Sequence, residues 1–172
     1  MGLDMYLYMG KYESAHRHDV KEGKNLPKDF YPEELKELEE DTLKYNFLSK
    51  ETLYQVGYWR KFNALHSWIV KNYAGGEDDC RKIYLEVEGV EKLLEICKEV
   101  AADHSKAPDL LPTQEGFFFG CTDYDDWYFK DVEYTINLLQ KVIKLVKEPI
   151  KEKDQNSAVR CFGWDIIYQA SW

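Results

Sequence analysis

The sequence predicts a single α+β domain, residues 1–172, in which a mainly antiparallel sheet of about four to five strands packs with three to four helices. Three observations predict this fold class. Strand-like segments and segments with helical spacing follow one another in irregular order, without internal repeats. The composition, 44% hydrophobic and 15% aromatic, is typical of a packed globule. The length suits one domain whose core needs no disulfide or metal.

The first third of the chain predicts two strands and one surface helix. In residues 3–12, methionine and leucine alternate with tyrosine, as in a strand with both faces at least partly covered. Residues 13–29 are polar and are expected to form a loop. Pro32 suits the first position of a helix with a thin apolar stripe, and residues 52–56 are expected to form a short strand.

The middle of the chain predicts two helices separated by a strand. From Gly57 onward, one apolar face with three- and four-residue spacing comprises Tyr58, Phe62, Leu65, Ile69 and Tyr73. The glycine pair at 75–76 ends this helix. Residues 83–87 alternate as a strand. A second helix is expected over 88–103, with Cys97 as a small core residue on its buried face.

The segment around three consecutive phenylalanines is the centre of the predicted fold. Phe117–Phe119 would place bulk on both faces of an extended chain, which predicts a central strand. Thr122 and Asp123 are expected to cap the next helix. Asp125 and Asp126 are expected in its first turn, where the helix dipole favours carboxylates.

The helix that follows is expected to be the longest, because Pro149 is the first residue that blocks its continuation. Its apolar stripe comprises Val132, Ile136, Leu139, Ile143 and Val146. Residues 150–157 are expected to form a charged loop, and residues 159–172 a last strand. We expect the first and last strands to lie side by side in the sheet.

The net charge of −9 argues against a nucleic-acid binder, because phosphate contacts require Lys and Arg, and against an anionic membrane surface. It leaves room for basic protein partners, although solubility alone explains it. The start of the chain lacks the features of a signal peptide, and the cysteines lie far apart in the sequence. We therefore expect a cytoplasmic protein with free thiols that binds no nucleic acid directly and no membrane.

The common glycine-rich phosphate-binding, nucleophile and zinc-binding motifs are missing from the sequence, and we expect no cofactor and no metal. If the protein were an enzyme, His66 would be the first general acid or base, since it lies in an element with an apolar pattern. Asp79, Asp126 or Asp131 could orient it. The helix dipole explains Asp125 and Asp126, and Asp131 lies about a turn and a half further on, which is a simpler explanation of the three than a metal site.

An aromatic cluster is the strongest candidate for a ligand site. Asn63 and His66 are three residues apart, and so are neighbours at the border of an apolar helix face. Such polar side chains more commonly satisfy backbone groups, and aromatic rings more commonly fill the core. The alternative is a cleft that stacks a planar ligand. Its predicted lining is Trp59, Arg60, Asn63, His66, Tyr124, Trp127 and Tyr128.

Four segments form a signature that spans nearly the whole chain, except roughly residues 14–50. They are the opening Met-Gly-Leu-Asp-Met-Tyr-Leu-Tyr, then Tyr58-Trp59-Arg60-Lys61-x-Asn63-Ala64-x-His66-x-Trp68, then Leu111-Pro112-Thr113-x-x-Gly116-Phe117-Phe118-Phe119-Gly120 with Tyr124-Asp125-x-Trp127-Tyr128, and the closing Tyr168-Gln169-x-Ser171-Trp172. Together they resemble an uncharacterised family of small proteins from bacteriophages and prophages. The resemblance implies an accessory protein made in the cytoplasm of a bacterial host and acting on host or defence components. It implies no established activity.

Three functional hypotheses follow. The preferred one is a non-enzymatic, phage-type accessory protein that binds a host or defence protein, or a small planar ligand such as a nucleotide, in an aromatic-lined pocket. The second is a small hydrolase or transferase that uses His66 with a carboxylate. The third is an acidic DNA mimic, which requires a stripe of carboxylates on one face. The sequence leaves the oligomeric state open.

Overall fold

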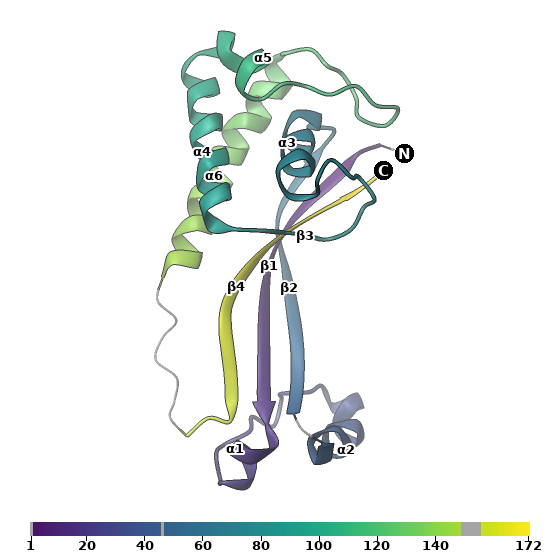
Figure 1. The fold of residues 1–172 in the computed structure, drawn as a ribbon, viewed down its shortest axis with the longest axis vertical. Helices are drawn as coiled ribbons and strands as arrows, with labels where there is room; N and C mark the ends of the chain where they lie inside the picture. Colours follow the sequence, from purple (N-terminus) through teal and green to yellow (C-terminus); the bar gives the residue numbers. More distant parts are fainter. Residues whose placement is uncertain (1, 46, 149–155) are drawn as a thin grey trace. The chain divides into compact units, whose positions relative to one another are not determined.

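The computed structural model describes residues 2–45, 47–148 and 156–172, and it confirms the α+β fold class (Figure 1). Its antiparallel sheet has the strand order β2-β1-β4-β3. The strands are β1 (Asp4–His16), β2 (Phe47–Arg60), β3 (Ile83–Leu85) and β4 (Val159–Ser171). The order confirms that the first and last strands are neighbours.

The longer helices are α2 (Lys36–Tyr45), α3 (Asn63–Tyr73), α4 (Val87–Ala102) and α6 (Asp126–Lys147). Shorter helical segments are α1 (Arg17–Lys21), η1 (Glu33–Leu35), η2 (His104–Lys106) and α5 (Ala107–Leu110). The longer helices agree with the predicted three to four. None of the helices in the described part of the chain has the length and apolar character needed to cross a membrane.

The chain divides into two compact units that share the long strands. The first comprises Met1–Met9, Tyr54–Glu148 and Asp165–Trp172, and the second Gly10–Leu53 and Pro149–Trp164. Strands β1, β2 and β4 each contribute residues to both units. The expected single domain stays a prediction.

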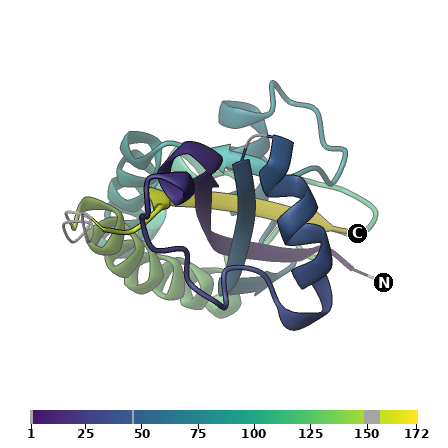
Figure 2. The same ribbon diagram turned by 90° about the horizontal axis from the view of Figure 1, so that it is seen from below.

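In the first unit, neighbouring elements approach each other closely at two glycines. Helices α4 and α6 lie side by side (Figure 1, Figure 2). A Cβ atom at Gly57 of β2 would lie 2.5 Å from Leu138 Cδ2 of α6, so the missing side chain lets this helix approach the strand. A Cβ atom at Gly89 of α4 would lie 1.3 Å from the Tyr73 hydroxyl at the end of α3. Glycine therefore sets how closely the helices pack.

The predicted buried face of α4 is confirmed, with Cys97 fully buried among Val90, Leu93, Leu94 and Val100. Burial raises the pKa of the Cys97 thiol to about 12. The predicted length of α6 is also confirmed, but its capping residues were predicted wrongly. Asp125 is the N-cap, since its Oδ1 accepts hydrogen bonds of 2.9 Å from the backbone N–H groups of Trp127 and Tyr128.

The predicted central strand at Phe117–Phe119 is wrong, because these residues form a turn. The Phe119 N–H donates to the Gly116 carbonyl over 3.1 Å, and Gly120 adopts a φ of +86°. A Cβ atom at Gly116 would lie 2.6 Å from the Phe119 ring, which folds back over it. The flanking glycines thus close a turn that leaves Phe117 95% exposed and Phe119 buried.

The predicted helix from Gly57 begins later than expected, because β2 continues to Arg60 and α3 starts at Asn63. Tyr58 is 41% exposed and Trp59 is 2% exposed, which is the alternation of a strand. Strand β2 also begins at Phe47, well before the expected short strand at 52–56.

In the second unit, the predicted loop over 13–29 is wrong in its first part. Strand β1 runs on to His16 and is followed by α1. Asp19 of α1 is buried and accepts hydrogen bonds from Lys24 and Arg160, which lower its pKa to about 2. A small apolar core in this unit comprises Ala15, Phe30, Leu48 and Ala158. Most of the predicted charged loop at 150–157 lies outside the described residues.

Candidate functional site

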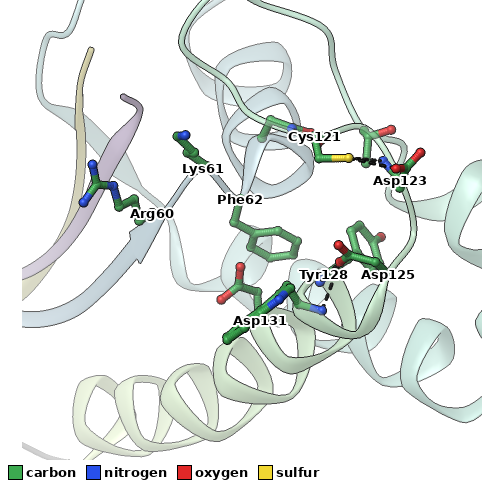
Figure 3. A pocket seen from close by; sticks show the side chains of 11 residues that line it. Arg60, Lys61, Phe62, Cys121, Asp123, Asp125, Tyr128 and Asp131 are labelled. Atoms are coloured by element: carbon green, nitrogen blue, oxygen red, sulfur yellow. Dashed lines mark hydrogen bonds between the residues drawn. The ribbon is translucent and has the colours of Figure 1, made fainter. Parts of the chain in front are cut away.

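A cleft of about 200 Å³ in the first unit lies where the end of β2 meets the start of α6 (Figure 3). It is lined by Arg60, Lys61, Phe62, Asn63, Thr113, Cys121, Asp123, Asp125, Trp127, Tyr128 and Asp131. In Figure 3, Arg60 and Lys61 lie at one end and Asp123 at the other, with Phe62 and Asp131 between them. The cleft therefore combines both signs of charge with aromatic surface.

Lys61 has an unusual backbone conformation, and two glycines leave space for its side-chain stem. Its φ is +63°, its N–H donates to the Leu3 carbonyl over 2.8 Å, and its carbonyl accepts from the Asn63 N–H. A Cβ atom at Gly120 would lie 3.0 Å from Lys61 Cβ, and one at Gly2 would lie 3.1 Å from Lys61 Cε. The side-chain stem thus occupies space that two side chains would otherwise take. Among the described residues, Lys61 forms no ion pair.

Arg60 supplies a second cation at the same end. Its side chain is 61% exposed, and its Nε lies 4.0 Å from an oxygen of Asp4, at the outer limit of an ion pair. Figure 3 shows its guanidinium group pointing away from Phe62. An exposed pair at this distance contributes little to stability, so Arg60 is available to an anionic group.

Asn63 lines the cleft, but its amide is already engaged. Its Nδ2 donates to the carbonyls of Phe119 (3.0 Å) and Cys121 (2.9 Å), and its Oδ1 accepts from the Gln114 N–H (2.9 Å). These bonds attach residues 114–121 to the start of α3. Asn63 therefore positions the wall of the cleft, which is the backbone role that the sequence offered as the more common alternative.

The acidic residues of the cleft differ in their partners. Asp125 caps α6, and Asp123 Oδ2 accepts the Cys121 thiol proton over 2.9 Å. The carboxylate of Asp131, by contrast, accepts no hydrogen bond and forms no ion pair within the described part of the chain. Burial, together with the nearby charge of Asp125, raises the pKa of Asp131 to about 6.

The acidic residues do not assemble a metal centre. Within residues 2–45, 47–148 and 156–172, no three His, Cys, Asp or Glu side chains are grouped so that they could hold a metal ion. Asp126, which the sequence placed together with Asp125 and Asp131, does not line the cleft.

Aromatic rings form the floor and the rim of the cleft. Phe62 is 3% exposed and Tyr128 is 5% exposed, and their rings meet edge to face with centroids 5.5 Å apart. The Tyr128 hydroxyl donates to the Leu111 carbonyl over 2.7 Å, which fixes its ring. Trp127 is 72% exposed at the rim, with the Lys130 ammonium 4.5 Å from its ring centroid.

Two of the predicted lining residues lie outside the cleft. Trp59 is buried in the core, where its indole N–H donates to Thr135 Oγ1 over 2.9 Å. Tyr124 packs its ring edge to face on Tyr128 with centroids 5.0 Å apart, and its hydroxyl accepts from the Thr113 N–H. Tyr124 thus contacts two residues that line the cleft, Tyr128 and Thr113.

His66 also lies outside the cleft, in a buried chain of hydrogen bonds. Its Nδ1 is 2.7 Å from the Tyr168 hydroxyl and its Nε2 is 2.9 Å from Asp78 Oδ2. Burial raises the pKa of Tyr168 well above its usual value, so this hydroxyl is neutral and donates. A histidine that accepts at Nδ1 and donates from Nε2 to Asp78 then satisfies every group.

The carboxylate beside His66 is therefore Asp78 rather than the predicted Asp79, which binds Arg81 instead over 3.2 Å. Asp78 Oδ2 also accepts the indole N–H of Trp172 over 3.0 Å. His66 is 2% exposed, and the cavity beside it has no room for a water molecule. The arrangement ties the loop after α3 to the end of β4.

The sequence did not predict Lys61 or Asp78 as site residues. It grouped Asp131 with the two aspartates at the start of α6, of which one caps the helix and the other lies outside the cleft. Lys61 depends on a positive φ and on glycines distant in sequence, which no local pattern indicates. Asp78 stands next to Asp79, and their side chains are chemically alike. The available signal for Lys61 was its place in a basic pair directly after a strand of aromatic residues.

No protein-family model, curated protein or solved structure matches this chain. The resemblance to phage and prophage proteins stays a prediction.

Proposed function

We propose that this protein is a non-enzymatic binding protein that holds one small planar ligand of mixed charge, of the nucleotide type, in the cleft at the start of α6. The observation that carries the proposal is that one cleft contains both a cation and a half-buried carboxylate whose side chains form no ion pair with the described residues. These are Lys61 and Asp131. Asp131 is partly buried, and an unpaired, partly desolvated carboxylate is costly, so a bound ligand would relieve that cost. Lys61 is exposed and open to an anionic group.

The size of the cleft favours a single ring system. Its volume of about 200 Å³ lies below the about 300–1,000 Å³ of pockets for drug-sized ligands. It exceeds the about 150 Å³ of a cavity that admits benzene. A nucleobase or a ring of similar size fits this space, with the rest of the ligand outside. A folded segment of a partner protein would insert no more than one side chain.

The distribution of charge favours a ligand with two unlike ends. Lys61 and Arg60 offer charge-assisted hydrogen bonds to an anionic group such as a phosphate. The exposed Trp127 offers an aromatic face to a planar ring, and the almost fully buried Phe62 and Tyr128 form the apolar floor beside it. Asp131 offers an acceptor to the polar edge of that ring. Nucleotides combine these features in one molecule.

A hydrolase or transferase centred on His66 has less support. Both ring nitrogens are engaged, by Tyr168 and Asp78, and the cavity that these described residues line has no room for a water molecule. A general base must reach a substrate or a water molecule, and this geometry offers neither.

The proposal is tested by calorimetric titration of nucleoside monophosphates into the full chain, preceded by a melting-temperature screen. We expect one or more nucleotides to raise the melting temperature, because a ligand that binds only the folded state stabilises it. Lys61→Ala should weaken binding by about 10- to 150-fold, as expected for the loss of one charge-assisted hydrogen bond of about 1.5–3 kcal/mol.

Lys71→Ala is the matched control, since Lys71 is exposed on α3 and lies outside the cleft. This variant should bind as the unmodified protein does. Absence of binding by every nucleotide in the panel would overturn the proposal. Equal losses in the Lys61 and Lys71 variants would also count against the cleft as the site.

A further inference from the structure

We infer that Asp131 recognises a planar pair of parallel N–H donors on the ligand, the arrangement that the Watson–Crick edge of guanine and the guanidinium group have in common. This inference rests on the proposed function, because it assigns the ring of the bound ligand to the same cleft. It goes further by stating which edge of that ring the protein reads.

The first step is that Asp131 is the carboxylate of the cleft whose two oxygens both lack a hydrogen bond from the described residues. Asp125 Oδ1 accepts from the backbone N–H groups of Trp127 and Tyr128, and Asp123 Oδ2 accepts from the Cys121 thiol, so neither has both oxygens available for two parallel donors. Within the described part of the chain, no donor approaches the Asp131 side chain. In Figure 3 it lies beside Phe62, between the basic end of the cleft and Asp123. A ring that enters the cleft beside Phe62 would therefore meet Asp131 with its edge.

The second step is that the neutral polar groups of the cleft are occupied. The Asn63 amide uses both of its donors and its oxygen on the backbone of residues 114–121. The Thr113 hydroxyl donates to the Thr122 carbonyl over 2.9 Å. No free amide therefore remains to read an adenine, which presents a donor next to an acceptor and which Asn and Gln bind through both of their amide atoms.

The third step is the chemistry of the carboxylate itself. An ionised carboxylate only accepts hydrogen bonds, and its two oxygens match two parallel donors. Guanine offers N1–H and N2–H side by side, as a guanidinium group offers two of its N–H groups. Adenine would place its N1 lone pair against a carboxylate oxygen, which is repulsive. Hypoxanthine, the base of IMP, keeps N1–H but lacks the second donor. Binding of IMP therefore tests directly whether both donors are needed.

The experiment compares GMP, IMP, AMP and L-arginine by calorimetry on the full chain at pH 7.5 and fixed ionic strength. We expect GMP to bind about tenfold or more tightly than IMP and AMP, the discrimination typical of one bidentate contact. Asp131→Asn should abolish this preference, because its amide presents a donor beside an acceptor. Asp131→Ala removes both oxygens and should have the same effect on the preference.

The matched control is Asp126→Asn, which also removes one negative charge from α6. Asp126 lies in the first turn of this helix and does not line the cleft. It should keep the preference for GMP. Tight binding of L-arginine that requires Asp131, without binding of any nucleotide, would overturn the nucleotide-type ligand of the proposed function, while it would keep the donor pair and identify guanidinium as its source.

The two proposals fail in different ways. Equal affinities for GMP, IMP and AMP, or a GMP preference that survives both Asp131 substitutions, would overturn the inference while the proposed function stands. Absence of binding by all four compounds would overturn the proposed function and the inference together.

Discussion

Asp131 is a residue at which stability and the proposed binding role are opposed. Its pKa is raised from 3.8 to about 6, so the folded protein binds its proton more tightly than the unfolded chain does. Stability therefore falls as the pH rises from about 4 to 6, and the cost remains in full at neutral pH. Natural proteins keep such costs mainly at functional sites.

Asp131→Asn should accordingly stabilise the protein at pH 7.5 and leave its stability nearly unchanged at pH 4. We expect a gain of about 1–2 kcal/mol after allowance for solvent screening, or about 3–6 °C in melting temperature. Melting curves of both proteins at the two pH values measure this. A gain of equal size at both would show that the carboxylate charge is not its cause.

The pKa of Asp19 is shifted in the opposite direction from that of Asp131, so its effect on stability changes with pH in the opposite way. Hydrogen bonds from Lys24 and Arg160 lower its pKa to about 2, so its ionised form is favoured by folding. Its contribution to stability is complete above about pH 4 and is lost as the pH falls toward 2. Asp19→Asn should therefore melt at a lower temperature at pH 7, and the difference should shrink as the pH approaches 2. A difference that is constant with pH would contradict the charged hydrogen bonds.

At the scale of single elements, sequence patterns predicted the helices better than the turns. The stripe of α4 around Cys97 has a clear helical period, and packing follows that period directly. Tyr58 and Trp59 fit both a helix and a strand, and the positive φ of Lys61 decides where the strand ends. The aromatic run at Phe117–Phe119 predicted a strand. The flanking glycines instead permit a turn that exposes the first ring and buries the last.

Local sequence patterns also predicted only part of the candidate site. Arg60, Asn63, Trp127 and Tyr128 were predicted from their types and spacing, and the structure brings them to one cleft. Whether they bind a ligand stays a prediction. Trp59 was wrongly predicted to line the cleft. Alternate residues of a strand face opposite sides of the sheet, and Trp59 lies on the side that faces the core.

Gly120 connects the turn to the cleft, and this gives a prediction at the scale of the element. Gly120→Ala would place a Cβ atom 3.0 Å from the Lys61 stem, at a φ of +86° that alanine rarely adopts. We expect a loss of more than about 1 kcal/mol in the free energy of unfolding, together with weaker ligand binding as Lys61 shifts. Urea unfolding and calorimetry measure the two effects.

Gly76→Ala is the matched control for backbone strain, since Gly76 has a φ of +84° and no atom within 4 Å of the added Cβ. It should reproduce the loss of stability that comes from the backbone and leave binding unchanged. If both variants lose the same stability and keep full affinity, the contact between Gly120 and Lys61 has no part in the site.

At the scale of the whole molecule, the chain uses polar and charged side chains in two ways. The cleft leaves Lys61 and Asp131 without partners among the described residues, whereas His66 has a partner for each ring nitrogen. Unpaired groups are expected where a ligand completes them, and paired groups where they support the fold. His66 thus attaches α3 to β4 through Tyr168 and to the following loop through Asp78.

His66→Ala separates a structural role for this residue from a catalytic one. It would leave the buried Tyr168 hydroxyl without its partner and open a cavity, and we expect a loss of about 2–4 kcal/mol in the free energy of unfolding. Tyr168→Phe removes one hydroxyl and keeps the ring, so its loss should be smaller, about 1–2 kcal/mol. Both variants, while folded, should bind the cleft ligand with unchanged affinity, because neither residue lines the cleft. Chemical unfolding gives the stabilities, and calorimetry below the unfolding transition gives the affinities. Full stability in His66→Ala would overturn the structural role and return His66 to consideration as a catalytic base.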